Sequence, residues 1–139
     1  MPDIKHYLVI KSPEEIIYKA VTEQKGLSSW WTTKTTAKAE VGSISEFKFG
    51  NEYYNKMLII SLNPFTKVEW KCVDGDREWI DTLISFELEP QQDKTILRFS
   101  QKNWKAETDF FASCNYNWGR YMISLKNYCE TGTGAPNTL

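Results

Sequence analysis

The sequence predicts an α+β fold: a curved antiparallel sheet of about six to seven strands around a long C-terminal helix, with two short helices after the first strand. Two patterns carry this prediction. Over residues 35–101 apolar and polar residues alternate, which is the period of half-buried strands. Over residues 109–130 apolar residues recur at steps of three and four, which places them on one helix face: Phe111, Cys114, Trp118, Tyr121, Leu125 and Tyr128.

The N-terminal part predicts one strand followed by two helices. Residues 6–10 form a short apolar strand. Ser12, Pro13 and Glu15 then give a strong helix start: the serine can cap, proline suits the first helical position, and the glutamate completes a capping box. We expect Gln-Lys-Gly at residues 24–26 to interrupt this helix, and a second, shorter helix to follow over residues 27–31.

The central part predicts strands joined by turns. We expect strands over residues 35–41, 45–49, 55–62, 67–72, 79–88 and 95–101. Asp-Gly-Asp at residues 74–76 predicts a tight hairpin, and residues 90–94 a loop. Alternation along these strands gives the residues that share the inward face: Phe47, Phe49, Val68, Trp70, Cys72, Ile80, Thr82, Ile84, Phe86, Leu88, Leu97 and Phe99.

The terminal helix contains a glycine, Gly119, which costs about 1 kcal/mol relative to alanine. Burial of the six apolar stripe residues, at roughly 1.5–3 kcal/mol each as an upper bound, outweighs this cost several-fold. We therefore expect the helix to form, with Gly119 allowing a close backbone contact or leaving room beside Trp118. Residues 131–139 should end the helix and fray, which leaves a single domain over residues 1–139 with an ordered core at about 4–130.

Composition narrows the possible partners and location. The chain has 139 residues and a net charge of −1, so no charge excess draws it to nucleic acid or to an anionic membrane. The longest apolar run, residues 57–60, is far too short to span a bilayer, and the first residues lack the layout of a signal peptide. Three widely spaced cysteines indicate free thiols in a reducing cytoplasm.

Motifs for catalysis or cofactor binding are absent from the sequence. His6 is the only histidine, no Cys-x-x-Cys occurs, and the glycines are scattered singly. No pair of carboxylates suggests acid–base catalysis, since Glu69 and Asp81 alternate outward. We therefore predict no catalytic residue, no metal site and no cofactor.

Aromatic residues are abundant: six tryptophans, seven tyrosines and seven phenylalanines. They can fill a core completely, or they can line an interior that accepts an apolar guest. Trp30 and Trp31 point about 100° apart on a helix, so both can anchor the helix, or one can act as a gate at a cavity mouth.

Five stretches together resemble a known family. They are residues 12–20 (Ser-Pro-Glu-Glu-Ile-Ile-Tyr-Lys-Ala), 26–31 (Gly-Leu-Ser-Ser-Trp-Trp), 63–64 (Asn-Pro), 84–90 (Ile-Ser-Phe-Glu-Leu-Glu-Pro), and 118–119 (Trp-Gly) followed by 125–126 (Leu-Lys). Their order over residues 4–130 resembles the Aha-type family, homologues of the C-terminal domain of the activator of the Hsp-90 ATPase. That family belongs to the START-like (SRPBCC) superfamily, and the resemblance implies its helix-grip fold.

The resemblance also implies a cavity between sheet and helix, because relatives bind sterols, lipids, polyketides or aromatic metabolites there. On that analogy the wall includes Trp31, Phe47, Phe49, Trp70, Trp118, Tyr121, Met122 and Leu125. Polar candidates that could orient a ligand are Thr82, Gln101, Asn115 and the Tyr121 hydroxyl.

The expected function is a non-catalytic binding protein for a small apolar or aromatic molecule such as a lipid, a sterol or a polyketide-like compound. A chaperone co-factor or protein-interaction module of the Hsp-90 ATPase activator type is the first alternative, and a cyclase or dehydratase the second. The sequence leaves the ligand and the oligomeric state open.

Overall fold

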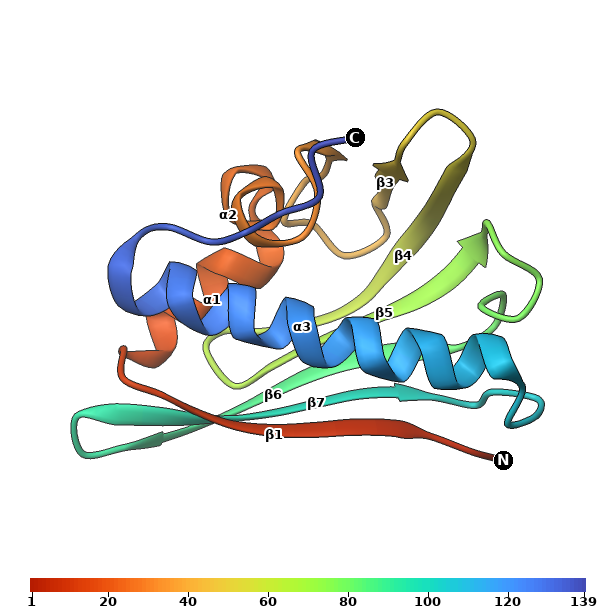
Figure 1. Ribbon diagram of the computed structural model, residues 1–139. Helices are drawn as coiled ribbons and strands as arrows, with labels where there is room; N and C mark the ends of the chain where they lie inside the picture. Colours follow the sequence, from red (N-terminus) through yellow and green to blue (C-terminus); the bar gives the residue numbers. More distant parts are fainter.

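The computed structural model describes all 139 residues and shows one seven-stranded antiparallel sheet with a long helix in its hollow (Figure 1). The strand order is β1-β7-β6-β5-β4-β3-β2. The elements, in chain order, are β1 (Ile4–Ile10), α1 (Glu14–Thr22), α2 (Gln24–Trp30), β2 (Lys34–Thr36), β3 (Ile44–Phe49), β4 (Tyr53–Asn63), β5 (Lys67–Asp74), β6 (Leu83–Gln91), β7 (Lys94–Lys102) and α3 (Asp109–Thr131). The predicted α+β architecture is confirmed.

Aromatic rings fill the centre of the space between the sheet and α3. Trp118 lies on the buried face of the helix, with its ring centroid 4.4 Å from that of Phe99 on β7 and 5.1 Å from that of Trp31, the residue after α2. Phe47 on β3 and Trp70 on β5 pack against Trp31, with ring centroids 4.4 and 6.1 Å from that of Trp31. All five side chains are buried, so this part of the interior is a packed core.

The α1–α2 corner differs in detail from the prediction. The break between the helices falls at Glu23, and residues 24–26 belong to α2. Gly26 is needed there because a Cβ at this position would lie 2.5 Å from the Cα of Ala20, so only glycine permits this close packing. The predicted cap is wrong as well: Pro13 is the N-cap without a side-chain bond, and the Ser12 carbonyl instead accepts from the Thr95 hydroxyl at 2.8 Å.

Two strand predictions are also corrected. The strand predicted over 35–41 shortens to β2, which pairs only with β3 at the sheet edge. The predicted tight hairpin at 74–76 is a longer loop over residues 75–82, because Trp79 turns inward to stack on Trp118 with ring centroids 6.0 Å apart. Burial of this indole outweighs continuation of the strand.

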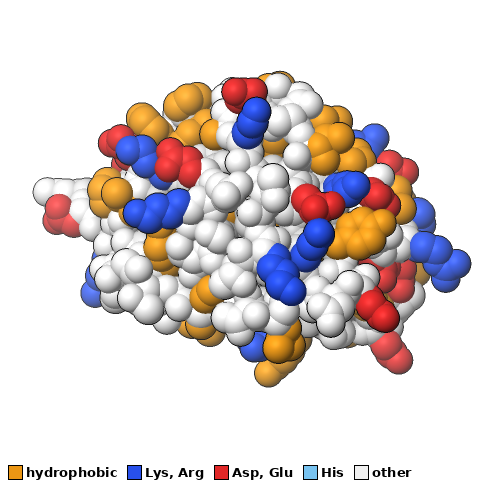
Figure 2. Space-filling view, turned by 90° about the horizontal axis from the view of Figure 1, so that it is seen from above, with side chains coloured by type: hydrophobic (Ala, Val, Ile, Leu, Met, Phe, Trp, Pro, Cys, Tyr) orange, Lys and Arg blue, Asp and Glu red, His pale blue; other side chains and the backbone are white.

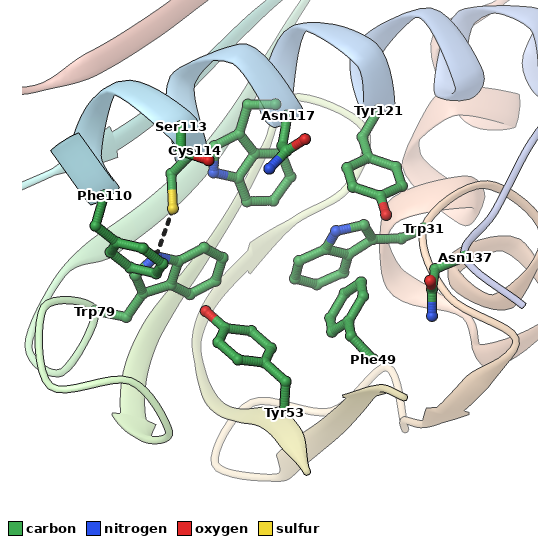
Figure 3. A pocket seen from close by; sticks show the side chains of 11 residues that line it. Trp31, Phe49, Tyr53, Trp79, Phe110, Ser113, Cys114, Asn117, Tyr121 and Asn137 are labelled. Carbon is green, nitrogen blue, oxygen red and sulfur yellow. Dashed lines mark hydrogen bonds between the residues drawn. The ribbon is translucent and has the colours of Figure 1, made fainter. Parts of the chain in front are cut away.

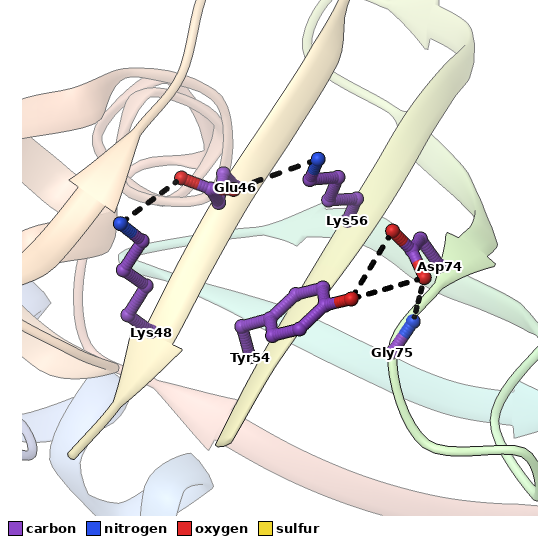
Figure 4. Close-up of polar contacts among 6 residues, drawn as sticks. All are labelled: Glu46, Lys48, Tyr54, Lys56, Asp74 and Gly75. Carbon is purple, nitrogen blue, oxygen red and sulfur yellow. Dashed lines mark hydrogen bonds and ion pairs between the residues drawn. The ribbon is translucent and has the colours of Figure 1, made fainter. Parts of the chain in front are cut away.

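Hydrogen bonds fix the start of this loop at the end of β5. On the outer face the Tyr54 hydroxyl of β4 donates to both carboxylate oxygens of Asp74 at 3.3 Å, and the Gly75 amide donates to Asp74 Oδ1 at 2.8 Å (Figure 4). Beside them, Glu46 pairs with Lys48 and Lys56 at 3.7 and 3.8 Å. Exposed ion pairs of this kind contribute at most about 1 kcal/mol each to the free energy of unfolding.

The terminal helix begins and ends within one residue of its predicted bounds. The Thr108 hydroxyl accepts from the Phe111 amide at 3.1 Å as an N-cap, and Gly132 at φ 87° ends the helix in the left-handed conformation. A Cβ at Gly119 would meet its nearest neighbour, His6 Cε1, at 3.6 Å. This is ordinary van der Waals separation, so the backbone at Gly119 makes no close approach that excludes a side chain.

Residues 131–139 do not fray as predicted. The chain after α3 folds back beside α2 and the end of β3 (Figure 1). The Asn137 amide donates to the Trp31 carbonyl at 2.8 Å, and the Asn137 carbonyl accepts from the Thr33 amide at 2.9 Å. The Ala135 amide donates to the Ser124 hydroxyl at 2.7 Å. These backbone bonds hold the segment in place despite its polar, glycine-containing composition.

The helices include no membrane span, and the charges on the face shown in Figure 2 form no patch of a single sign. No helix of the structure is long and apolar enough to cross a membrane. On the face shown in Figure 2, basic and acidic side chains are interspersed, with hydrophobic side chains between them.

Candidate functional site

A pocket of about 330 Å³ opens between the N-terminal half of α3, the β3–β4 hairpin and the loop over residues 75–82 (Figure 3). Most of its lining side chains are aromatic. The lining comprises Trp31, Phe49, Tyr53, Trp79, Phe110, Ser113, Cys114, Asn117, Trp118, Tyr121 and Asn137.

Helical spacing explains why α3 supplies so much of this lining. Its contributing residues fall at positions 110, 113, 114, 117, 118 and 121, the steps that keep one face of a helix in register. Phe49 ends β3 and Tyr53 begins β4, so the short connection between these strands delivers both rings to the same rim. Asn137 comes from the segment that folds back along Thr32.

Three stacked indoles form a continuous wall of the pocket. The Trp31 and Trp118 rings stack at 5.1 Å with planes 29° apart, and the Trp118 and Trp79 rings at 6.0 Å with planes 16° apart. The Trp79 indole N–H donates to the Cys114 sulfur at 3.4 Å. The Trp31, Trp118 and Trp79 side chains are 2%, 2% and 6% exposed, so each borders the pocket with a small part of its apolar surface.

A buried polar chain fixes two of these indoles. The Trp118 indole N–H donates to Gln101 Oε1 at 2.8 Å, and Gln101 Nε2 donates to the Thr82 hydroxyl at 3.0 Å. The Thr82 hydroxyl in turn donates to the Trp79 carbonyl at 2.6 Å. Gln101 and Thr82 are fully buried, so this chain couples β7 and the loop to α3 without water. We call Trp118, Gln101, Thr82 and Trp79 the indole-locking chain.

Every ionisable side chain that lines the pocket is neutral near pH 7. Burial raises the pKa of the Tyr53 and Tyr121 phenols, and it raises the pKa of the Cys114 thiol to about 11. The Tyr53 hydroxyl points toward Trp79, and the Tyr121 hydroxyl points toward Trp31 (Figure 3). With the Asn117 amide they supply uncharged donors and acceptors around an apolar centre.

The sequence-predicted wall residues divide into two groups. Four of them line the pocket: Trp31, Phe49, Trp118 and Tyr121. The others lie outside the lining: Phe47, Trp70, Met122 and Leu125 are buried in the packed core, and Thr82 belongs to the indole-locking chain. Of the other polar candidates, Gln101 is buried in the same chain and Asn115 is exposed on α3.

Sequence reasoning missed several lining residues. Phe110, Ser113 and Asn117 share the helix face of the predicted stripe, so their spacing could have found them. Trp79 and Asn137 lie in segments that were assigned to a strand and to a frayed tail, and no local signal corrects those assignments.

Other places in the structure offer less for a ligand. No group of three or more histidine, cysteine, aspartate or glutamate side chains is arranged to hold a metal ion. His6 lies on β1, 6.2 Å from the Phe99 ring, and is not part of the pocket lining. A hollow of about 470 Å³ between α1, α2 and the end of α3 has a mixed lining that includes the charged side chains of Lys19, Glu23 and Lys25.

Comparison with known families agrees with this architecture. Residues 11–130 match the family model described as activator of Hsp90 ATPase homolog 1-like protein. The chain belongs to this family. The matched residues include strands β2 to β7 and all of α3 except its last residue. Membership of this family supports a ligand-binding or Aha1-like domain. No curated protein sequence matches the chain significantly.

Solved structures show the same fold over nearly the whole chain. The solution structure of an Aha1 dimer from Colwellia psychrerythraea is 38% identical, covers 96% of this chain and 100% of that one, and has a TM-score of 0.88. Protein MLL2253 from Mesorhizobium loti is 17% identical, with 91% and 95% covered and a TM-score of 0.80. Protein BH1534 from Bacillus halodurans is 20% identical, with 94% and 98% covered and a TM-score of 0.76.

Proposed function

We propose that this protein is a non-catalytic binding protein that holds one small, largely apolar aromatic molecule in the pocket beneath α3. The observation that carries the proposal is the row of stacked indoles Trp31, Trp118 and Trp79, which line the pocket and of which Trp118 and Trp79 are held by the indole-locking chain. The pocket volume of about 330 Å³ lies at the lower end of the usual range for small-molecule sites.

The chemistry of the lining favours binding over catalysis. General acid–base catalysis near neutral pH works best with a group whose pKa lies near the working pH. The pKa of the Cys114 thiol is raised to about 11, and the pKa values of both lining phenols are raised above the ordinary tyrosine value. These groups can donate hydrogen bonds to a ligand, but they are poor proton shuttles or nucleophiles at pH 7.

Titration with the neutral fluorophore N-phenyl-1-naphthylamine tests the proposal. We expect saturable binding at one site per chain, with an increase in probe fluorescence and quenching of tryptophan emission. Ser113 is exposed at the pocket rim, so Ser113→Phe should obstruct the pocket and weaken binding at least tenfold. The adjacent Ala112 is exposed outside the lining, so Ala112→Phe is the matched control and should bind as the unsubstituted protein does.

Absence of binding by the unsubstituted protein to this probe and to lipid, sterol and polyphenol panels would overturn the proposal. Equal loss of affinity in the Ser113→Phe and Ala112→Phe proteins would place the site elsewhere.

A protein-interaction role is the second candidate, and two observations favour it. The relative at 38% identity is described as an Aha1 dimer, and the family is described by its likeness to an Hsp90 ATPase activator. On this chain, Val41, Ile44 and Ile60 are 62%, 56% and 37% exposed near the start of β3, where Ile44 pairs with Leu58 of β4. We call these three residues the β3–β4 corner; it lies at the opposite end of the strand pair from the connection that lines the pocket. Exposed apolar groups in one area are typical of interaction surfaces.

Sedimentation velocity and an Hsp90-type ATPase assay test this second candidate. A role at the β3–β4 corner predicts that Ile44→Lys lowers self-association or ATPase stimulation while probe binding in the pocket stays unchanged. A monomeric unsubstituted protein without effect on the ATPase would exclude it.

A further inference from the structure

Charged side chains are distributed unevenly around the pocket, although none of them belongs to its lining. Two half-buried carboxylates, Asp76 and Glu78, lie in the loop that supplies the Trp79 wall. Asp76 Oδ1 accepts from the Glu78 amide at 2.8 Å, and the Asp76 carbonyl accepts from the Trp79 amide at 2.9 Å. The Thr108 hydroxyl donates to Glu78 Oε1, which joins the loop to the start of α3 close to Phe110.

Neither carboxylate is neutralised by a partner. No lysine or arginine nitrogen lies within 4.0 Å of Asp76 or Glu78, whereas Asp81 in the same loop pairs with Lys71 at 3.6 Å. On the opposite rim the exposed Arg120 donates to Asn117 Oδ1 at 3.1 Å. Arg77, which lies between the two carboxylates in the sequence, is exposed and forms no ion pair with either of them. The Trp79 side of the pocket therefore carries two unpaired carboxylates.

This charge acts on groups inside the pocket. Burial is the main cause of the raised pKa of the Cys114 thiol, and Asp76 and Glu78 raise it further. Asp76 also adds to the raised pKa of the Tyr53 phenol, after burial and Cys114. The negative charge of Asp76 and Glu78 also opposes any anionic ligand group placed between Cys114 and Tyr53.

From this geometry we propose that the pocket selects uncharged planar aromatic molecules and rejects anionic derivatives of the same skeleton, because Asp76 and Glu78 flank its Trp79 side. This inference rests on the proposed ligand-binding function and names the class of ligand. A hydrogen-bond donor on the ligand, such as a phenolic O–H, is favoured at the Trp79 side. A carboxylate or sulfonate loses its hydration there and finds no cation in the lining.

A matched pair of fluorophores tests the selectivity. N-phenyl-1-naphthylamine is neutral, and 8-anilino-1-naphthalenesulfonate adds a sulfonate to the same skeleton. We expect the neutral probe to bind at least tenfold more tightly at low salt. This ratio should narrow at 1 M NaCl, where the screening length falls to about 3 Å.

A double variant separates the carboxylates from the general preference of apolar sites for neutral probes. Asp76→Asn with Glu78→Gln keeps an acceptor oxygen at each hydrogen bond and removes both charges. The double variant should reduce the ratio of the two probes' dissociation constants at least threefold, mainly because the sulfonate binds more tightly. Asp81→Asn is the control, since the Asp81 carboxylate lies in the same loop but is paired with Lys71; it should leave the ratio unchanged.

The outcomes distinguish the inference from the function on which it rests. If neither probe binds, the proposed function fails. If both bind and the ratio is below tenfold, or if neither salt nor the double variant narrows it, the inference is overturned and the proposed function stands. The salt series on the unsubstituted protein decides the matter even if the double variant does not fold.

Discussion

Replacement of Gln101 by leucine tests whether the indole-locking chain holds the pocket wall in place. Leucine has a similar volume, so the variant removes hydrogen bonds without a large cavity. The buried Trp118 indole N–H loses its 2.8 Å acceptor, and the Thr82 hydroxyl loses a donor at 3.0 Å but keeps its own bond to the Trp79 carbonyl. A buried donor left without a partner costs about 1–3 kcal/mol.

We therefore expect Gln101→Leu to lower the free energy of unfolding by about 1–3 kcal/mol, most of it from the Trp118 N–H. Trp118→Phe removes the donor itself, so the double variant should cost less than the sum of the single variants. Urea unfolding of the four proteins gives the coupling energy, which we expect to be at least about 1 kcal/mol. Strict additivity within about 0.3 kcal/mol would refute the locking role, because residues that share a buried bond must couple.

Three other substitutions test separate parts of the account. Gly119→Ala should stabilise the protein by up to about 1 kcal/mol in thermal unfolding, since the added methyl meets its nearest neighbour at 3.6 Å; destabilisation would mean that the space is not there. Gly26→Ala should destabilise it by at least about 1–3 kcal/mol, because the methyl would lie 2.5 Å from the Ala20 Cα; an unchanged midpoint would refute this packing. The hydrogen bond from the Lys11 amide, and to a smaller extent Lys126, lower the pKa of Glu130. The stability that the Glu130 carboxylate contributes is therefore present above the ordinary glutamate pKa and is lost as the pH falls through the lowered pKa. Glu130→Gln should flatten the acid side of the stability profile measured by urea unfolding from pH 3 to 7, and an identical slope would contradict the assignment.

The alternation of residues predicted the sheet because period two reports directly which face of a strand is buried. It placed Phe47, Trp70 and Phe99 on the inner face, and the three- and four-residue steps of α3 placed Trp118 opposite them. The resemblance added the topology. Neither pattern indicates how far along a strand a residue lies from the open end of the sheet. The sequence therefore did not distinguish Phe47 and Trp70, which pack in the core, from Phe49, which lines the pocket.

Two of the segments that were predicted wrongly are fixed by partners far away in the chain. Residues 79–88 alternate as a strand should, but Trp79 is drawn inward by Trp118 and Cys114, which lie on α3. The segment around Asn137 has the composition of a frayed end, yet its backbone pairs with Trp31 and Thr33. Backbone donors and acceptors are the same in every residue but proline, so such pairing leaves no mark in the sequence.

The most direct test of the central claim, that an aromatic ligand lies against the indole row, is an ¹⁵N–¹H NMR titration of the tryptophan side chains. The account predicts that N-phenyl-1-naphthylamine shifts the indole N–H signals of Trp31, Trp79 and Trp118. The Trp30 signal should stay in place, because its N–H donates to the Ala20 carbonyl at 2.8 Å and its ring is outside the lining. Shifts confined to Trp30, or saturable binding that moves none of the three pocket indoles, would contradict it.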